Sequence, residues 1–424
     1  MNEHDSEIMA GLLEQRGYVP VADVSDAAVE IINTCSVRDN ADSRFFGTLG
    51  QLKKRKKEDP WFTVCICGCM MQQERVTEIV KQKYPWVDLI FGTHNIGRLP
   101  ELLVRAQSDN DILMEVWQGR EDVDEDYPSD RLFKMKALVN IMYGCNNFCS
   151  YCVVPYTRGR EVSRPAANIC SEVENLAGDG VKEIMLLGQN VNSYRAGKMN
   201  FTDLLRMIER VDGIERIRFM TSHPKDISYG LIEFMAKSEK MCKYLHLPLQ
   251  SGSDAVLSRM NRRYSAEKYR GIIDALRNAM PDITISTDII VGFPGESEED
   301  FRATLDMVEY ARYDSAFTFI YSPRPGTPAA LMDDQIPDDV SHERFNRLVD
   351  AVNRISLEKN REYIGSRQRI LVEGRSKRNM DKLRGRTDGF KLVNFTGSEE
   401  LIGEFADVDI TDAKTFSLEG RIKQ

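Results

Sequence analysis

The sequence predicts an α/β protein with a doubly wound N-terminal domain, a partial (β/α)6 barrel and a small C-terminal β-barrel. Short apolar segments alternate with helix-length segments up to residue 108, and again from residue 131 to residue 364. From residue 365 onward, β-branched and aromatic residues are broken by Gly and Asp, as in small all-β domains. A chain of 424 residues is also longer than one hydrophobic core usually organises.

The first domain is expected over residues 1–108. Helices are predicted at 4–16, 41–58, 72–84 and 99–106, and strands at 28–35, 62–69 and 87–92. Ligands of open parallel sheets bind at the carboxyl ends of the strands. Cys35 and Cys69 are expected at that edge.

Residues 109–130 carry nine acidic residues and one basic residue, Arg120, which predicts a solvated linker. In the following domain, over 131–364, strands are predicted at 137–143, 183–187, 216–220, 244–248, 284–291 and 316–321. Helices are predicted at 201–211, 267–280, 298–312 and 340–363. The third domain is expected over 365–424, with strands near 393–395 and 404–410.

Composition indicates where the protein is located and which chemistry its cysteines support. No apolar run approaches the roughly 18 residues of a membrane span, and the acidic first 30 residues lack the pattern of a secretory signal. We therefore expect a cytoplasmic protein without a membrane partner. Nine cysteines in a reducing compartment favour metal ligation over disulfides. A net charge of −9 argues that any contact with nucleic acid is local.

The strongest chemical motif is the Cys-x3-Cys-x2-Cys loop of Cys145, Cys149 and Cys152, directly after the first strand of the predicted barrel. Three thiolates at this spacing can ligate three irons of a [4Fe-4S] cluster and leave the fourth iron open to a small molecule. Another metal such as zinc, or thiols packed in a core, are the alternatives. Structural zinc sites normally close with four ligands, and no second cysteine pair lies nearby.

The cysteine spacing resembles the radical S-adenosylmethionine (SAM) superfamily, and residues 141–144 and 153–165 are similar to the methylthiotransferases, with a resemblance that covers essentially the whole chain. The resemblance implies that the open iron chelates SAM, whose cleavage yields a radical that abstracts hydrogen. It also implies that Tyr151 packs against the adenine of SAM, although a loop aromatic that fills the barrel mouth is the alternative. Gly188, Gln189 and Gln250 would line the SAM pocket, whereas His223 and His246 are equally compatible with structural roles.

The family resemblance further implies a second [4Fe-4S] cluster that supplies or relays sulfur. Residues 33–38 and 68–73 match two of its motifs, so Cys35 and Cys69 are its predicted ligands. The third family cysteine would lie two residues before Met1, and we expect a start site placed too far downstream or a truncated chain. Cys65, Cys67 and Cys69 alternate along one predicted strand and share a face. Neighbouring residues on one face of a strand are about 6.6 Å apart, so binding one cluster together would strain the strand geometry. The remaining thiols are expected in the core: Cys65, Cys67, Cys170 and Cys242.

The C-terminal domain resembles the TRAM module, an RNA-binding fold. Residues 366–392 hold nine basic and three acidic residues, which favours phosphate contacts or, alternatively, a solvated basic face. The RNA-binding candidates are Arg375, Lys377, Arg378, Arg384 and Arg386. Three aromatics are expected in the small core, with base stacking as the alternative: Phe390, Phe395 and Phe405.

Residues 154–159, 190–194 and 385–387 look most like the family members that thiomethylate C2 of N6-(dimethylallyl)adenosine at position 37 of tRNA, using two SAM molecules. The implied partners are the tRNA anticodon loop and an electron donor such as flavodoxin or ferredoxin, with the enzyme a monomer. Rival hypotheses are a sister methylthiotransferase acting on threonylcarbamoyl-adenosine or on a ribosomal protein, a non-catalytic RNA-binding protein, and a zinc-stabilised RNA-binding protein.

Overall fold

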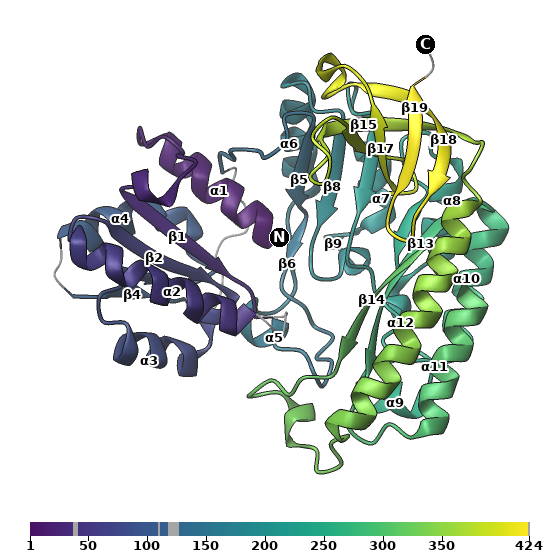
Figure 1. Cartoon of the computed structure of the whole chain (residues 1–424), viewed down its shortest axis with the longest axis horizontal. Helices are drawn as coiled ribbons and strands as arrows, with labels where there is room; N and C mark the ends of the chain where they lie inside the picture. The colour runs from purple at the N-terminus through teal and green to yellow at the C-terminus, as the bar shows by residue number, and fades with distance from the viewer. Residues whose placement is uncertain (37–40, 109–110, 118–126, 423–424) are drawn as a thin grey trace. The chain divides into compact units, whose positions relative to one another are not determined.

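The computed structural model describes residues 1–36, 41–108, 111–117 and 127–422 (Figure 1). The chain forms two compact units. Unit 1 consists of Met1–Leu132, Met142–Phe148 and Cys152–Asn168, and unit 2 of Phe133–Ile141, Cys149–Tyr151 and Ile169–Gln424. Among the described residues, no helix combines the length and apolar character needed to cross a bilayer.

Unit 1 is built on a parallel four-stranded sheet, in the order β1 (Val29–Thr34), β2 (Thr63–Gly68), β3 (Leu89–Phe91) and β4 (Leu113–Glu115). Successive side chains of a strand point to opposite faces, so β2 feeds two cores. One core packs Cys65 and Cys67 against α1 (Asn2–Glu14) and α4 (Leu99–Ser108). The other packs Ile66 against α2 (Ala41–Glu58) and α3 (Glu74–Lys83). Helices on both faces confirm the doubly wound fold.

The segment that we predicted as an acidic linker is not a linker throughout. Its residues 113–115 form β4, which pairs in parallel with β3. Leu113 packs into one core of the sheet, while Ile112 and Val116 pack into the other. These three apolar side chains pack on opposite faces of the sheet and hold the segment in place, although acidic residues surround it. A count of charges does not show such packing. Residues 109–110 and 118–126 of that prediction lie outside the described residues.

Unit 2 contains six parallel strands in chain order, which confirms the partial barrel. One set joins β5 (Lys136–Asn140), β8 (Glu183–Leu187) and β11 (Arg216–Phe219), and the other joins β12 (Tyr244–His246), β13 (Thr284–Val291) and β14 (Ser315–Ile320). A bridge between Ile217 and Met241 connects the two sets. The surrounding helices are α6 (Ala166–Gly178), α7 (Phe201–Ile208), α8 (Tyr229–Lys237), α9 (Asp254–Arg259), α10 (Ala266–Ala279), α11 (Glu298–Ala311) and α12 (Asp338–Arg361). Figure 1 shows α10, α11 and α12 along one side of β13 and β14.

Short elements complete the chain. In unit 1, β6 (Met142–Tyr143) pairs with β7 (Val162–Ser163) and the helical turn α5 (Val154–Thr157) lies between them in sequence. In unit 2, β9 (Arg195–Ala196) pairs with β10 (Met199–Asn200).

The C-terminal domain is a closed barrel of β15 (Arg367–Arg375), β16 (Leu383–Arg386), β17 (Leu392–Thr396), β19 (Leu418–Ile422) and β18 (Phe405–Ala413), in that order. Its core includes Ile370, Val393 and Phe395. The small barrel covers the amino-terminal ends of the larger one, because Arg216 and Arg218 of β11 donate to backbone carbonyl oxygens of residues 369 and 386–388.

Candidate functional site

The cysteine loop begins at a backbone turn that only glycine fits. Gly144 follows β6 with a φ of +70°, and a Cβ there would lie 2.0 Å from the carbonyl oxygen of Arg160. The next residue, Cys145, donates its backbone N–H to the carbonyl oxygen of Gly159 at 3.1 Å. The β6–β7 hairpin thereby fixes the backbone where the first cysteine stands.

The second cysteine faces a buried cation. The Sγ of Cys149 accepts a hydrogen bond from Nη1 of Arg262 at 3.3 Å, and both side chains are buried. Ser150 next to it is held by the carbonyl oxygens of Arg259 and Met260, at the end of α9. The Arg262 guanidinium therefore places a positive charge beside this sulfur.

The donor set of this loop suits an iron–sulfur cluster. Cys152 accepts a backbone hydrogen bond from Val154 at 3.4 Å, so a second sulfur of the loop also meets an N–H donor. Hydrogen bonds to sulfur are a usual feature of such clusters. Within the described ranges, no three Cys, His, Asp or Glu side chains are already gathered around one point. The fit therefore rests on donor type and spacing.

Tyr151 packs against a hydrophobic cluster of Val256, Met260, Phe293 and Ala329. Its ring centroid is 6.4 Å from that of Phe293, and Ile290 and Tyr321 pack against the same cluster. This packing holds the ring in place and is compatible with both roles predicted for it.

Two strand-end loops carry unusual backbone conformations. Thr221 after β11 and Gln250 after β12 have φ values of +64° and +65°, which is rare for residues with a side chain and is concentrated at functional sites. Gln250 is held by backbone bonds with Asp288 and Ile290, and Thr221 donates its hydroxyl to the carbonyl oxygen of Gly188 at 2.6 Å. Gly188 and half-buried Gln189 directly follow β8.

Both histidines are engaged by the fold. His223 Nδ1 accepts the backbone N–H of Lys225 at 3.2 Å, and burial together with nearby Arg262 lowers the pKa of His223 far below its ordinary value. His246 Nδ1 is 2.9 Å from the hydroxyl of Ser286, and its Nε2 lies 3.4 Å from the Asp288 carboxylate. These contacts give His223 a structural role, while His246 stands beside a carboxylate.

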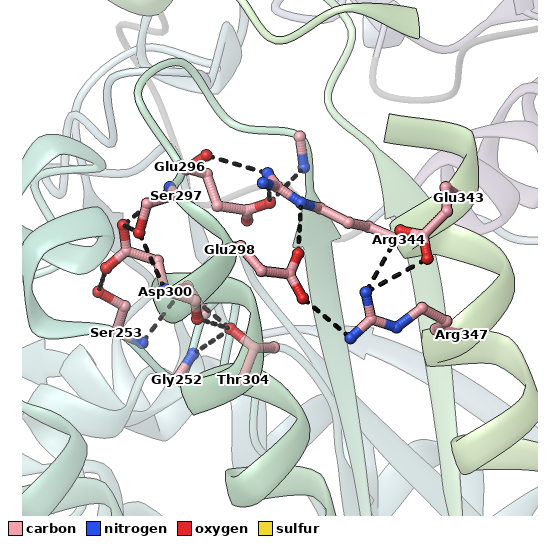
Figure 2. Close-up of polar contacts among 12 residues, drawn as sticks. Gly252, Ser253, Glu296, Ser297, Glu298, Asp300, Thr304, Glu343, Arg344 and Arg347 are labelled. Atoms are coloured by element: carbon pink, nitrogen blue, oxygen red, sulfur yellow. Dashed lines mark hydrogen bonds and ion pairs between the residues drawn. The ribbon is translucent and has the colours of Figure 1, made fainter. Parts of the chain in front are cut away.

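A polar network fixes the loop after β13 (Figure 2). The buried Glu296 carboxylate accepts the backbone N–H of Gly292 at 3.0 Å and Nη1 of Arg344 in α12 at 2.8 Å. Asp300 accepts from Ser253, and Thr304 accepts the N–H of Gly252 at 2.9 Å. The loops after β12 and β13 are thus tied to α11 and α12.

In unit 1, Cys69 stands apart from the two cysteines before it. Cys65 and Cys67 are fully buried in an apolar core, as predicted. The expectation that all three alternate along one strand is wrong, because β2 ends at Gly68, whose φ of +99° turns the chain. Cys69 begins the turn that follows, and Cys35 follows β1, the neighbouring strand.

Arg158 is the functional neighbour that the sequence analysis missed. Its Nε donates to the Sγ of Cys69 at 3.1 Å and its Nη2 to the Asp5 carboxylate at 2.6 Å, all within unit 1. Burial raises the pKa of the Cys69 thiol, and the Arg158 charge opposes that rise. Arg158 lay inside a motif that the resemblance rested on, but its partners are distant in sequence.

The five RNA-binding candidates divide into two groups. Arg375, Lys377 and Arg378 are exposed around the turn between β15 and β16. Arg384 and Arg386 are half-buried, and Arg386 donates to the carbonyl oxygen of Phe390 at 3.0 Å. Arg386 therefore has a partner within the fold, and its contact with RNA stays a prediction.

The three aromatics also divide. Phe395 is fully buried in the small barrel, as predicted. Phe390 and Phe405 are half-buried and lie outside that core, contrary to the prediction. Arg218 and Arg386 lie over Phe390, and Arg216 and Arg369 lie over Phe405. These two rings serve the contact between the small barrel and the larger one.

Three family models match the chain. The Radical SAM superfamily matches residues 139–308, the TRAM domain matches residues 361–423, and the uncharacterized protein family UPF0004 matches residues 1–92.

Solved structures share the fold. The radical S-adenosylmethionine methyltransferase TsrM from Kitasatospora setae is similar with a TM-score of 0.57 and 15% identity, over 78% of this chain and 71% of that one. The cobalamin-dependent S-adenosylmethionine radical enzyme OxsB is similar with a TM-score of 0.52 and 12% identity, over 81% of this chain and 54% of that one.

Curated relatives match over the full chain. A tRNA-2-methylthio-N(6)-dimethylallyladenosine synthase from Alkaliphilus oremlandii is 52% identical over 100% of this chain and 91% of the relative. Proteins of the same name from Clostridioides difficile and Clostridium novyi are 52% and 51% identical, over 89% and 94% of their lengths and 99% and 100% of this chain. The resemblance seen in the cysteine loop is thereby confirmed, and the chain belongs to the tRNA-2-methylthio-N(6)-dimethylallyladenosine synthase family.

Proposed function

We propose that this chain adds a methylthio group to C2 of N6-(dimethylallyl)adenosine at position 37 of tRNA, using two SAM molecules. The observation that carries the proposal is the full-length similarity of about half of all residues to synthases of that name. The sister activities on threonylcarbamoyl-adenosine or on a ribosomal protein are not favoured by these relatives.

Cys145, Cys149 and Cys152 would hold the [4Fe-4S] cluster of the radical SAM fold. When bound, this cluster supplies the electron that cleaves SAM to the radical that removes hydrogen from C2. The chain supplies position and charge. Arg262 donates to the Cys149 sulfur at 3.3 Å. Gly188, Gln189 and Gln250, on the fixed loops after β8 and β12, would line a SAM pocket. Tyr151 would pack against the adenine of SAM.

Cys35 and Cys69 would provide ligands to a second [4Fe-4S] cluster, whose sulfur would be methylated by the other SAM. This proposal is supported by the positions of both cysteines directly after adjacent parallel strands, at one edge of the sheet. It is also supported by Arg158, which stabilises the negative charge of the Cys69 sulfur.

Arg375, Lys377 and Arg378 would contact tRNA phosphates, since they are exposed and lie together on the TRAM domain. Arg384 belongs to this proposal less directly, because it is half-buried. The target adenosine must leave its stack in the anticodon loop before its C2 edge can be reached. Flavodoxin or ferredoxin as electron donor, a monomeric state and a cytoplasmic location complete the proposal.

Iron and acid-labile sulfide per chain, measured after anaerobic reconstitution, test the two clusters. The chain is compared with a version that carries an added cysteine two residues before Met1, and each of the two is compared with its Cys149→Ala and Cys69→Ala variants. About eight irons in the extended chain, falling to about four in either variant, support both clusters. If a parent chain and its Cys69→Ala variant both hold about four irons, only the radical cluster is present, and sulfur transfer is contradicted.

A further inference from the structure

Unit 2 carries two phenylalanines on a sheet face that the helices do not cover. On β13, Ile285 and Ile289 are fully buried, whereas Asp288 and Ile290, which point the opposite way, are partly exposed. The register pairs Asp288 with Phe317 and Ile290 with Phe319 of β14, so these four side chains share the open face. Phe317 is 54% exposed and Phe319 is 41% exposed.

This open face combines exposed rings with a few polar groups, among them Asp288, His246 and Ser286. The carboxylate of Asp288 lies 3.4 Å from Nε2 of His246, and the ring centroid of His246 lies 6.0 Å from that of Phe317. A carboxylate and a histidine on one face with two exposed rings fit the pattern of a small-molecule site, in which apolar area supplies affinity and a few polar groups supply orientation.

The open face connects the two parts of unit 2 that the proposed reaction requires. At its carboxyl end, Ile290 and Tyr321 pack against the buried cluster around Phe293, and Tyr151 packs against the same cluster. At its amino end, the ring of Tyr244 on β12 lies 4.9 Å from that of Phe390 in the TRAM domain. Phe319 precedes Tyr321 by two residues on the same face, about 7 Å along the strand. A base held on Phe317 and Phe319 would therefore lie on the amino-terminal side of the cluster against which Tyr151 packs.

We infer that Phe317, Phe319 and Asp288 select the substrate by its N6 substituent. The two phenyl rings pack against the branched alkyl chain of the dimethylallyl group, and the Asp288 carboxylate accepts the N6–H of the adenine. The same carboxylate repels the negatively charged threonylcarbamoyl group, so the open face excludes the substrate of the sister enzymes. This inference rests on the proposed function and names the residues that give it specificity.

Binding of synthetic anticodon stem-loop RNAs to the reconstituted full chain tests the inference. The RNAs differ only in the N6 substituent of one adenosine, which is hydrogen, dimethylallyl or threonylcarbamoyl, and fluorescence anisotropy gives each Kd. We expect Phe317→Ala and Phe319→Ala each to lower the preference for dimethylallyl over hydrogen by about tenfold. Phe319→Leu keeps apolar area and should retain most of the preference. Asp288→Asn should strengthen binding of the threonylcarbamoyl RNA.

Tyr229→Ala is the matched control, because Tyr229 is an aromatic residue with 80% exposure on α8, away from the open face. It should leave all three Kd values unchanged. A preference that survives both Phe→Ala variants, or an equal loss with Tyr229→Ala, overturns the inference. The methylthio product made by the unaltered chain is measured in parallel, and its absence with every RNA would count against the proposed function instead.

Discussion

We predict that Arg218 contributes strongly to the stability of the contact between the TRAM domain and the barrel of unit 2. Its side chain is fully buried, and its two Nη atoms donate to the carbonyl oxygens of Asp388 and Thr387 at 2.7 and 2.8 Å. Its Nε lies 3.1 Å from the Glu183 carboxylate. Replacement by methionine, Arg218→Met, keeps much of the volume and removes the charge and all these donors.

The cost of this replacement follows from what remains behind. Removing one partner of a buried ion pair costs about 3–5 kcal/mol, because the other charge stays buried. Glu183 keeps two neighbours, Lys136 at 3.5 Å and Arg216 at 3.8 Å, which reduces its penalty. The two carbonyl oxygens lose charged donors, each worth about 1.5–3 kcal/mol in other proteins. We therefore expect a loss of about 4 kcal/mol.

Urea unfolding and limited proteolysis measure this loss. Arg218→Met should lower the unfolding free energy of unit 2, release the TRAM domain to protease sooner, and raise the KM for tRNA more than it lowers kcat. Arg206→Met is the control, since Arg206 pairs with Asp203 on the surface and should cost under about 1 kcal/mol. Equal stability of Arg218→Met and Arg206→Met would refute the reasoning.

Three further predictions concern the cysteine sites and pH. Gly144→Ala should reduce iron per chain, because its Cβ would meet the Arg160 carbonyl oxygen at 2.0 Å; a normal iron content would contradict the turn described here. Arg158→Gln should shift the reduction potential of the second cluster, measured by electron paramagnetic resonance during a redox titration. Arg55→Gln is the control and should not shift this potential, because Arg55 donates to the carbonyl oxygen of Ala27 elsewhere in unit 1. Because burial holds the pKa of His223 far below its ordinary value of about 6.5, the unfolded chain binds the extra proton, so stability should fall below that pH by up to about 1.4 kcal/mol per pH unit. Urea unfolding at several pH values should show a smaller loss for His223→Gln, and parallel curves would contradict the assignment.

The periodic parts of the chain could be predicted from the sequence. Strand β13 and helix α2 begin and end at the residues expected, because apolar runs between turn residues and a long stretch of helix-forming residues are local signals. Strand β4 was missed, since its three residues lie among acids and are held by contacts with distant parts of unit 1.

The candidate site was predictable as a set of motifs and not as a set of contacts. The cysteine spacing indicated which thiols matter, but nothing in it indicated that Arg262 would face Cys149 or that Arg158 would face Cys69. Those pairs join residues more than eighty positions apart. For the same reason, the charge of Arg386 suggested a surface position, and the sequence did not reveal its contacts with the ring and carbonyl oxygen of Phe390.

The central claim is methylthiolation of a prenylated adenosine of tRNA, and mass spectrometry of nucleosides tests it most directly. The anaerobically reconstituted chain is incubated with SAM, a reductant and tRNA that carries N6-(dimethylallyl)adenosine at position 37, and the tRNA is then digested. We predict the 2-methylthio derivative of that nucleoside, and none of it with Cys149→Ala. No such nucleoside from this tRNA, or methylthiolation of threonylcarbamoyl-adenosine or a ribosomal protein in its place, would contradict the account.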